Sequence, residues 1–147
     1  MPIFVTLMMK KTTLILGFAV LAISSCKKAI LEPNSGIYHG VFIQVLDNGD
    51  TNAQGIVNLA LTSNGGGGTF SMNGDTASGA PYPCAGNYVI DNSAKMTFTN
   101  TAVVDTIEYS QPHYILDTTY SYVFDDHNFV LQLMAGTTRY QYNLIRD

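Results

Sequence analysis

The chain has 147 residues, with 7 Lys and Arg against 11 Asp and Glu, and its formal net charge at pH 7 is −4. Only 12% of the residues are charged and no basic patch occurs, which argues against nucleic acid as a partner. Nine Tyr, seven Phe and thirteen Gly, with no Trp, favour a protein built from β-strands and turns.

The first element is a leader. Lys10 and Lys11 precede an apolar run over residues 14–23. A positive segment followed by about 7–15 apolar residues is typical of a secretory signal peptide. The run is shorter than the roughly 20 apolar residues needed to span a bilayer. The protein is therefore expected to be exported, with either Met1 or Met9, the methionine directly before the lysines, as the start.

The leader ends in Ile23-Ser24-Ser25-Cys26. This motif resembles the lipobox of bacterial lipoproteins, in which one apolar and two small residues precede a modified cysteine. The resemblance implies cleavage before Cys26, a diacylglyceryl group on its thiol and an acylated amino terminus. An ordinary cleaved signal with a chance cysteine, or an uncleaved anchor, is the alternative. The expected division is a signal peptide over 1–25, a lipidated tether over 26–35 and one β domain over 36–147.

An anchor of this kind determines location. Two or more acyl chains give stable membrane binding where one does not, and Lys27 and Lys28 add attraction to anionic headgroups. By resemblance to lipoprotein sorting, Lys27 after the cysteine favours the outer membrane facing the periplasm, with the cell surface as the alternative. Lipidation of Cys26 leaves Cys84 without a disulfide partner, and such a cysteine is expected to be buried.

The remaining chain alternates short apolar and polar runs with Gly, Pro, Asn and Asp, the pattern of short strands joined by turns. Gly40 within the first run indicates a bulge, a bend or a close backbone approach. Turns are expected at 47–50 and 64–68, and a long loop at 74–84. Strands are expected at 36–46, 55–62, 69–73, 86–91, 95–99, within 102–115, and at 118–124, 129–133 and 139–145.

No segment after Cys26 keeps a helical period over ten residues, so the fold class is all-β, preceded by an N-terminal signal helix. Eight or nine sequential strands predict a small antiparallel up-and-down β-barrel, with a β-sandwich as the alternative. Gly36-x-Tyr38-x-Gly40, the hairpin around Asp91 and the closing Tyr-rich meander resemble the small lipocalin-like lipoproteins of Bacteroidota-type bacteria.

Residues that could carry chemistry are scattered. His39, His113 and His127 lie in separate segments without metal-ligand spacing, so no metal is expected. The polar stretches 47–52 and 125–126 share oxygen ligands with calcium loops, but their spacing fits plain turns better. No nucleophile elbow or phosphate loop occurs. The sequence therefore predicts neither an enzyme nor a bound cofactor.

The expected function is binding. An eight-stranded barrel either fills its own interior or holds one small ligand, and the sequence leaves both open. We expect a non-enzymatic, lipid-anchored envelope protein that binds a small apolar ligand or a partner protein. An envelope inhibitor or structural lipoprotein acting through its loops is the alternative, and a small hydrolase ranks below both. The candidate ligand-binding residues, all on inward faces, are Tyr38, Phe42, Tyr88, Tyr120, Tyr122, Tyr140 and Tyr142.

Overall fold

The computed structural model describes residues 31–74, 81–102 and 112–147, and these form eight strands and one short 3-10 turn. The leader, Cys26 and most of the strand expected within 102–115 lie outside the described residues. The turn is η2 (Pro112–Tyr114). The strands are β1 (Gly36–Val45), β2 (Thr51–Ser63), β3 (Gly67–Gly74), β4 (Cys84–Ile90), β5 (Lys95–Asn100), β6 (Thr119–Phe124), β7 (Asn128–Ala135) and β8 (Thr138–Arg146).

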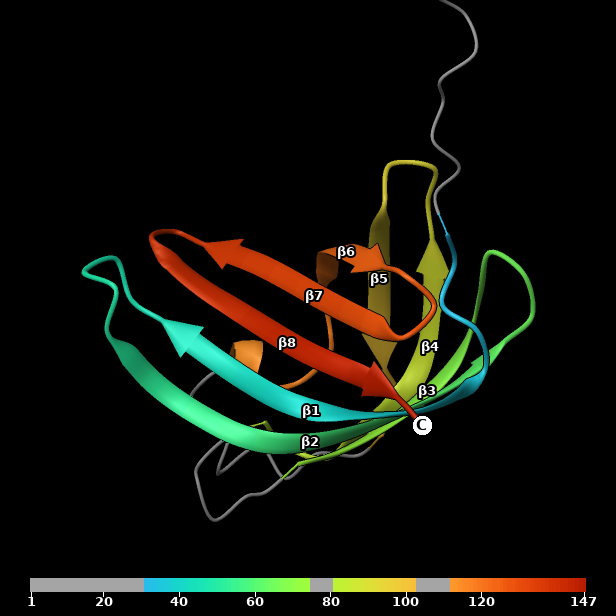
Figure 1. Ribbon diagram of the computed structural model, residues 1–147, viewed down its shortest axis with the longest axis horizontal. Coiled ribbons are helices and arrows are strands. Elements are labelled where there is room, and N and C mark those ends of the chain that lie inside the picture. Colours follow the sequence, from blue (N-terminus) through green and yellow to red (C-terminus); the bar gives the residue numbers. More distant parts are fainter. Residues whose placement is uncertain (1–30, 75–80, 103–111) are drawn as a thin grey trace, which may run out of the picture.

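The strands close into a barrel in sequence order, each pairing antiparallel with the next (Figure 1). β1 and β8 complete the wall through a ladder that runs from Tyr38 opposite Arg146 to Val45 opposite Arg139. The predicted all-β, lipocalin-like, up-and-down barrel is thus confirmed, and the β-sandwich alternative is wrong. Closure removes free sheet edges among the described strands, which is how antiparallel folds avoid edge-to-edge association.

Strict alternation of side chains places the core inside the wall. In β6, Tyr120, Tyr122 and Phe124 are buried while the residues between them are exposed. The inward positions of the other strands were predicted with the same period of two. The barrel interior is therefore lined by aromatic and aliphatic side chains from all eight strands.

Gly40 permits β1 to approach β8 closely. A Cβ atom at this position would lie 1.9 Å from the backbone oxygen of Asn143, a separation that no side chain tolerates. Of the three possibilities that the sequence indicated, a close backbone approach is the one found, and the irregularity in the β1–β2 ladder lies further along, between Gln44 and Val45.

The barrel has two unlike ends. At the first end, the tether end, short turns join β2 to β3, β4 to β5 and β6 to β7. At the opposite end, the loop end, lie the β1–β2 turn, the β7–β8 turn, the last residues of β3 and β5, and the first residues of β4 and β6. Residues 31–35 and Asp147 both lie at the tether end (Figure 1), where the backbone N–H of Asp147 donates to the oxygen of Ile37.

Residues 31–35, expected to be part of a tether, are held against the tether end. The Ser35 hydroxyl oxygen accepts the backbone N–H of Ser63 at 2.8 Å, and a Glu32 carboxylate oxygen accepts that of Gly66 at 3.0 Å. The Tyr38 hydroxyl donates to the backbone oxygen of Asn34 at 2.7 Å, and Pro33 is buried. Residues from Glu32 onward are therefore part of the folded unit.

β2 begins four residues earlier than expected, at Thr51 rather than Gly55. The preceding turn is tight, because the N–H of Leu46 donates to the oxygen of Asp50 at 2.9 Å and Gly49 takes a φ of 86°. Pairing with β1 can therefore start at once, although the side chains there are polar.

Within the described ranges, no helix is long and apolar enough to cross a bilayer.

Candidate ligand site in the barrel interior

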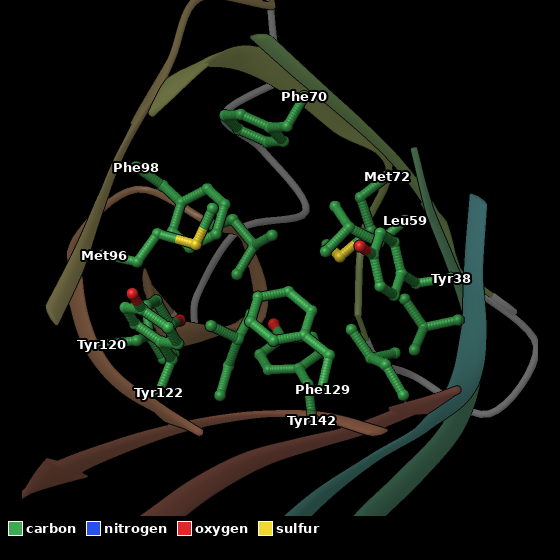
Figure 2. Packing of buried hydrophobic residues seen from close by; sticks show 14 of the residues in the cluster. Tyr38, Leu59, Phe70, Met72, Met96, Phe98, Tyr120, Tyr122, Phe129 and Tyr142 are labelled. Carbon is green, nitrogen blue, oxygen red and sulfur yellow. The ribbon is translucent and has the colours of Figure 1, made fainter. Parts of the chain in front are cut away.

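All seven candidate ligand-binding residues point into the barrel and are buried. They come from four strands: two from β1, one from β4, two from β6 and two from β8. Figure 2 shows Tyr120 and Tyr122 side by side on one wall, with Tyr142 and Phe129 beside them and Tyr38 on the opposite wall. The fold thus brings together residues that are spread over more than a hundred positions.

The rings form a connected cluster. Phe42 lies 4.9 Å from Tyr142 between ring centroids, and Tyr142 lies 5.9 Å from Tyr120. Tyr120 contacts Phe98 at 5.9 Å in an edge-to-face arrangement, a geometry that aromatic pairs favour. Phe129 links Tyr38 to Tyr122 in the same manner. Phe98 and Phe129 belong to this site as much as the seven predicted residues, and their inward parity was the signal for them.

A buried polar cluster closes the interior at the loop end. Gln44 is the one buried polar or charged residue among those described. Its Oε1 accepts hydrogen bonds from the Tyr114 hydroxyl and from Asn52 Nδ2, each at 2.8 Å, and its Nε2 donates to the Tyr140 hydroxyl at 3.2 Å. His113 packs on the Tyr140 ring at 4.8 Å. Sequence reasoning missed this cluster, although a glutamine at an inward position of a strand pointed to it.

Four other tyrosines keep buried hydroxyls without a hydrogen-bond partner among the described residues. The Tyr120 and Tyr142 hydroxyls influence each other's pKa, and Ser63 influences that of Tyr88, but none of these contacts reaches hydrogen-bond geometry. Burial raises the pKa of Tyr120 and of Tyr142 well above the ordinary value. The four are Tyr88, Tyr120, Tyr122 and Tyr142.

Cys84 is a free, buried cysteine, as expected. The backbone N–H of Leu116 donates to its Sγ at 3.5 Å, so the thiol helps to fix the segment that follows η2. Burial raises the pKa of the thiol to about 11. At neutral pH it is therefore protonated and a poor nucleophile.

The three histidines lie apart. His39 is on the outer wall, where its Nδ1 is 2.6 Å from a carboxylate oxygen of Asp147. His113 lies at the loop end and His127 in the β6–β7 turn. In the part of the chain that the structure describes, no three His, Cys, Asp or Glu residues form a group that could hold a metal ion.

The polar stretches at 47–52 and 125–126, which share oxygen ligands with calcium loops, both lie in turns. Their carboxylate oxygens accept hydrogen bonds from neighbouring residues of the same turn. In the first, Asp47 Oδ1 accepts the N–H of Asn48 at 2.8 Å, and Asp50 accepts from Asn48 Nδ2 at 2.6 Å. In the second, Asp125 Oδ1 accepts both the N–H and the Nδ2 of Asn128, at 2.7 and 3.0 Å. These contacts are those of ordinary turns stabilised by Asx side chains.

The outer wall carries a shallow hollow of about 480 Å³ beside Gly40. Its lining is largely aliphatic, and the outward side chains Val41, Val130 and Ile145 meet there from three adjacent strands. A smaller hollow of about 320 Å³ lies between the β1–β2 and β7–β8 turns and includes Asp47 and Arg139. The protein therefore has two apolar regions that could contact a binding partner. One is the buried barrel interior, and the other is the hollow of about 480 Å³ on the outer wall.

Comparisons with known protein families, with curated proteins and with solved structures found no match to this chain.

Proposed function

We propose that the protein is a lipid-anchored, non-enzymatic binding protein of the cell envelope, and that its barrel takes up a small apolar ligand. The observation that carries the binding proposal is the interior itself. Seven aromatic residues predicted from sequence converge inside one closed wall, and small eight-stranded barrels are a common place for a single small ligand.

The position of residues 31–35 supports the anchoring proposal. Cys26 precedes Leu31 by five residues, which span at most about 17 Å when extended. A lipid on Cys26 would therefore hold the tether end next to the membrane, and the loop end would face away. We place the protein at the outer membrane facing the periplasm, with the cell surface as the alternative.

The outer surface near the tether end agrees with this orientation. Ile37, Val89, Val123 and Ile145 are each more than half exposed, and each lies one residue from the end of its strand at this rim. Asp91 and Asp125 in the neighbouring turns would repel an anionic surface. Lys27 and Lys28 in the tether, with Lys95 and Arg146 at the same rim, would offset this repulsion, so the exposed aliphatic side chains are the feature that favours membrane contact.

The anchor can be tested on the full chain. Radiolabelled palmitate should be incorporated into the parent protein and not into a Cys26→Ala variant, and the parent alone should stay in the membrane fraction after a high-salt wash. A parent protein that matures without incorporating label would refute the anchor. Binding can be tested separately by native mass spectrometry of the domain from residue 27, purified from cells, where a retained small molecule is expected.

A partner protein is the second candidate, and the hollow on the outer wall favours it. Val41, Val130 and Ile145 form an uncharged aliphatic surface there, of the kind that marks interaction sites when it is contiguous. A Val41→Asp, Val130→Asp double variant should lose any envelope protein captured by the parent. Capture that is unchanged in this variant would argue against the wall as the interface.

A further inference from the structure

The buried tyrosine hydroxyls of this barrel fall into two groups, those with and those without a hydrogen-bond partner among the described residues. Near the barrel ends, Tyr38 donates to a backbone oxygen, and Tyr114 and Tyr140 both bond to Gln44. The hydroxyls of the other four buried tyrosines have no hydrogen-bond partner among the described residues. Tyr88 and Tyr122 lie two residues from the tether-end limits of β4 and β6, whereas Tyr120 and Tyr142 have no exposed surface at all.

A buried hydroxyl without a partner is unfavourable, because folding removes its hydrogen bonds to water and returns nothing. Phenylalanine fills the same kind of space without that disadvantage. This core already uses Phe at inward positions on β1, β3, β5, β6 and β7, for example Phe98 and Phe129. Retaining tyrosine at four inner positions is explained if something absent from the protein itself accepts their hydrogen bonds.

Tyr120 and Tyr142 are the strongest pair. Both have no exposed surface, they come from β6 and β8, and their rings meet at 5.9 Å. If one hydroxyl turned to donate to the other, the second O–H would still be left as a free donor. The pair therefore always offers at least one hydrogen to an acceptor inside the barrel.

We propose that the barrel interior binds a neutral molecule with an apolar body and an oxygen acceptor, such as a ketone or ester carbonyl, and that Tyr120 and Tyr142 donate hydrogen bonds to that oxygen. This inference rests on the proposed ligand-binding function and names its ligand class.

The interior excludes an anionic ligand. No Lys, Arg or His is buried among the described residues, and Gln44, the one buried polar residue, is already bonded at the loop end. A buried carboxylate without a cation loses far more hydration than four hydroxyls can replace. The raised pKa of Cys84, caused by burial, reflects the same resistance to negative charge.

Three probes that share a naphthalene ring test separately whether the ligand must be neutral and whether it must carry an oxygen acceptor. They are 2-acetonaphthone, which is neutral and carries a carbonyl, 2-naphthoate, which is an anion, and naphthalene, which has no acceptor. Binding would be measured by calorimetry to the domain from residue 27, since every strand pairing and the described core lie within residues 31–147. The ketone should bind about tenfold or more tightly than the carboxylate at neutral pH.

The variants identify the donors. A Tyr120→Phe, Tyr142→Phe double variant should lower the affinity for the ketone about fivefold or more and leave naphthalene unchanged, since only the hydrogen bond is removed. Tyr114→Phe is the matched control, because the Tyr114 hydroxyl already donates its hydrogen to Gln44, and this variant should keep the preference for the ketone. Phenylalanine adds no volume, so the variants should fold.

The outcomes distinguish the two proposals. Carboxylate binding as tight as that of the ketone, or an unchanged ketone preference in the double variant, would overturn this inference while the binding function stands. Failure of all three probes to bind would overturn both. Ordered waters that bond to both hydroxyls and remain there when the ketone is bound would also refute the role of the pair.

Discussion

The Tyr114 hydroxyl donates a 2.8 Å hydrogen bond to Oε1 of Gln44, a residue seventy positions earlier in the chain. The same segment is fixed twice more, because the oxygen of Tyr114 accepts the N–H of Tyr82 at 2.8 Å and Leu116 donates to Cys84. Leu116 has no exposed surface. The loop end of the barrel is thus covered by a short segment that is held by one glutamine, one thiol and one backbone contact.

Replacing Gln44 by Leu should lower the free energy of unfolding by about 2–3 kcal/mol, because the Tyr114 and Tyr140 hydroxyls lose a partner while remaining buried. Urea denaturation followed by circular dichroism measures this change. Gln132→Leu, at a half-buried outward position, is the control and should shift stability by less than about 0.5 kcal/mol. Equal effects at the two positions would contradict the role given to Gln44.

Replacing Gly40 by Ala should be more damaging than its size suggests. The added methyl would meet the backbone oxygen of Asn143, which cannot move without parting β1 from β8. We expect a loss of about 3 kcal/mol or more, as for severe overpacking. Gly36→Ala is the control, since its methyl meets only the flexible Arg146 side chain at 3.1 Å. A Gly40→Ala protein with parental stability would mean that the close approach is not required.

The pKa of Cys84, raised by burial to about 11 from an ordinary value of 9.0, predicts a pH dependence. In the unfolded chain the thiol ionises above its ordinary pKa, whereas in the barrel it stays protonated, so stability falls as the pH rises. Between about pH 8 and pH 10 the free energy of unfolding should drop by about 1 kcal/mol from this group. Comparing the parent with Cys84→Ala isolates the effect, and parallel pH profiles for the two proteins would disprove it.

Burial raises the pKa values of Tyr120 and Tyr142, so these tyrosines should not ionise while the barrel is folded. Their tyrosinate absorbance should appear in one cooperative step at alkaline pH, together with the loss of the circular dichroism signal. The amplitude of that step should shrink in the Tyr120→Phe, Tyr142→Phe double variant. A gradual titration of all tyrosines in the folded protein would show instead that water reaches the interior.

Much of the fold could be predicted from the sequence because a barrel strand obeys a simple period. The alternation at Tyr120, Tyr122 and Phe124 fixed both the strand and the face that it buries. Gly40 indicated a bulge, a bend or a close backbone approach, because a glycine within a strand has no side chain to keep a neighbouring backbone away. Sequential hairpins then left few arrangements other than a closed meander.

The rest depends on contacts between distant residues. Nothing local tells which residue will accept the hydroxyl of Tyr114, since Gln44 meets it only after the wall has closed. Glu32 and Ser35 are attached to the tether end through the backbone N–H groups of Gly66 and Ser63. Every residue type except proline carries such a group, so the sequence does not indicate which one will be the partner. The same holds for the four tyrosines whose hydroxyls have no partner among the described residues, because a missing contact cannot be inferred from a sequence pattern.

The pairing of β1 with β8 has a consequence for biogenesis. The first strand pairs with its second neighbour only through β8, from Arg139 to Arg146, so the wall cannot close until β8 has been synthesised. Contacts so far apart in sequence form slowly, so the pairing of β1 with β8 is expected to be a late step in folding. A chain truncated before β8 would leave β1 and β7 as open edges and should aggregate.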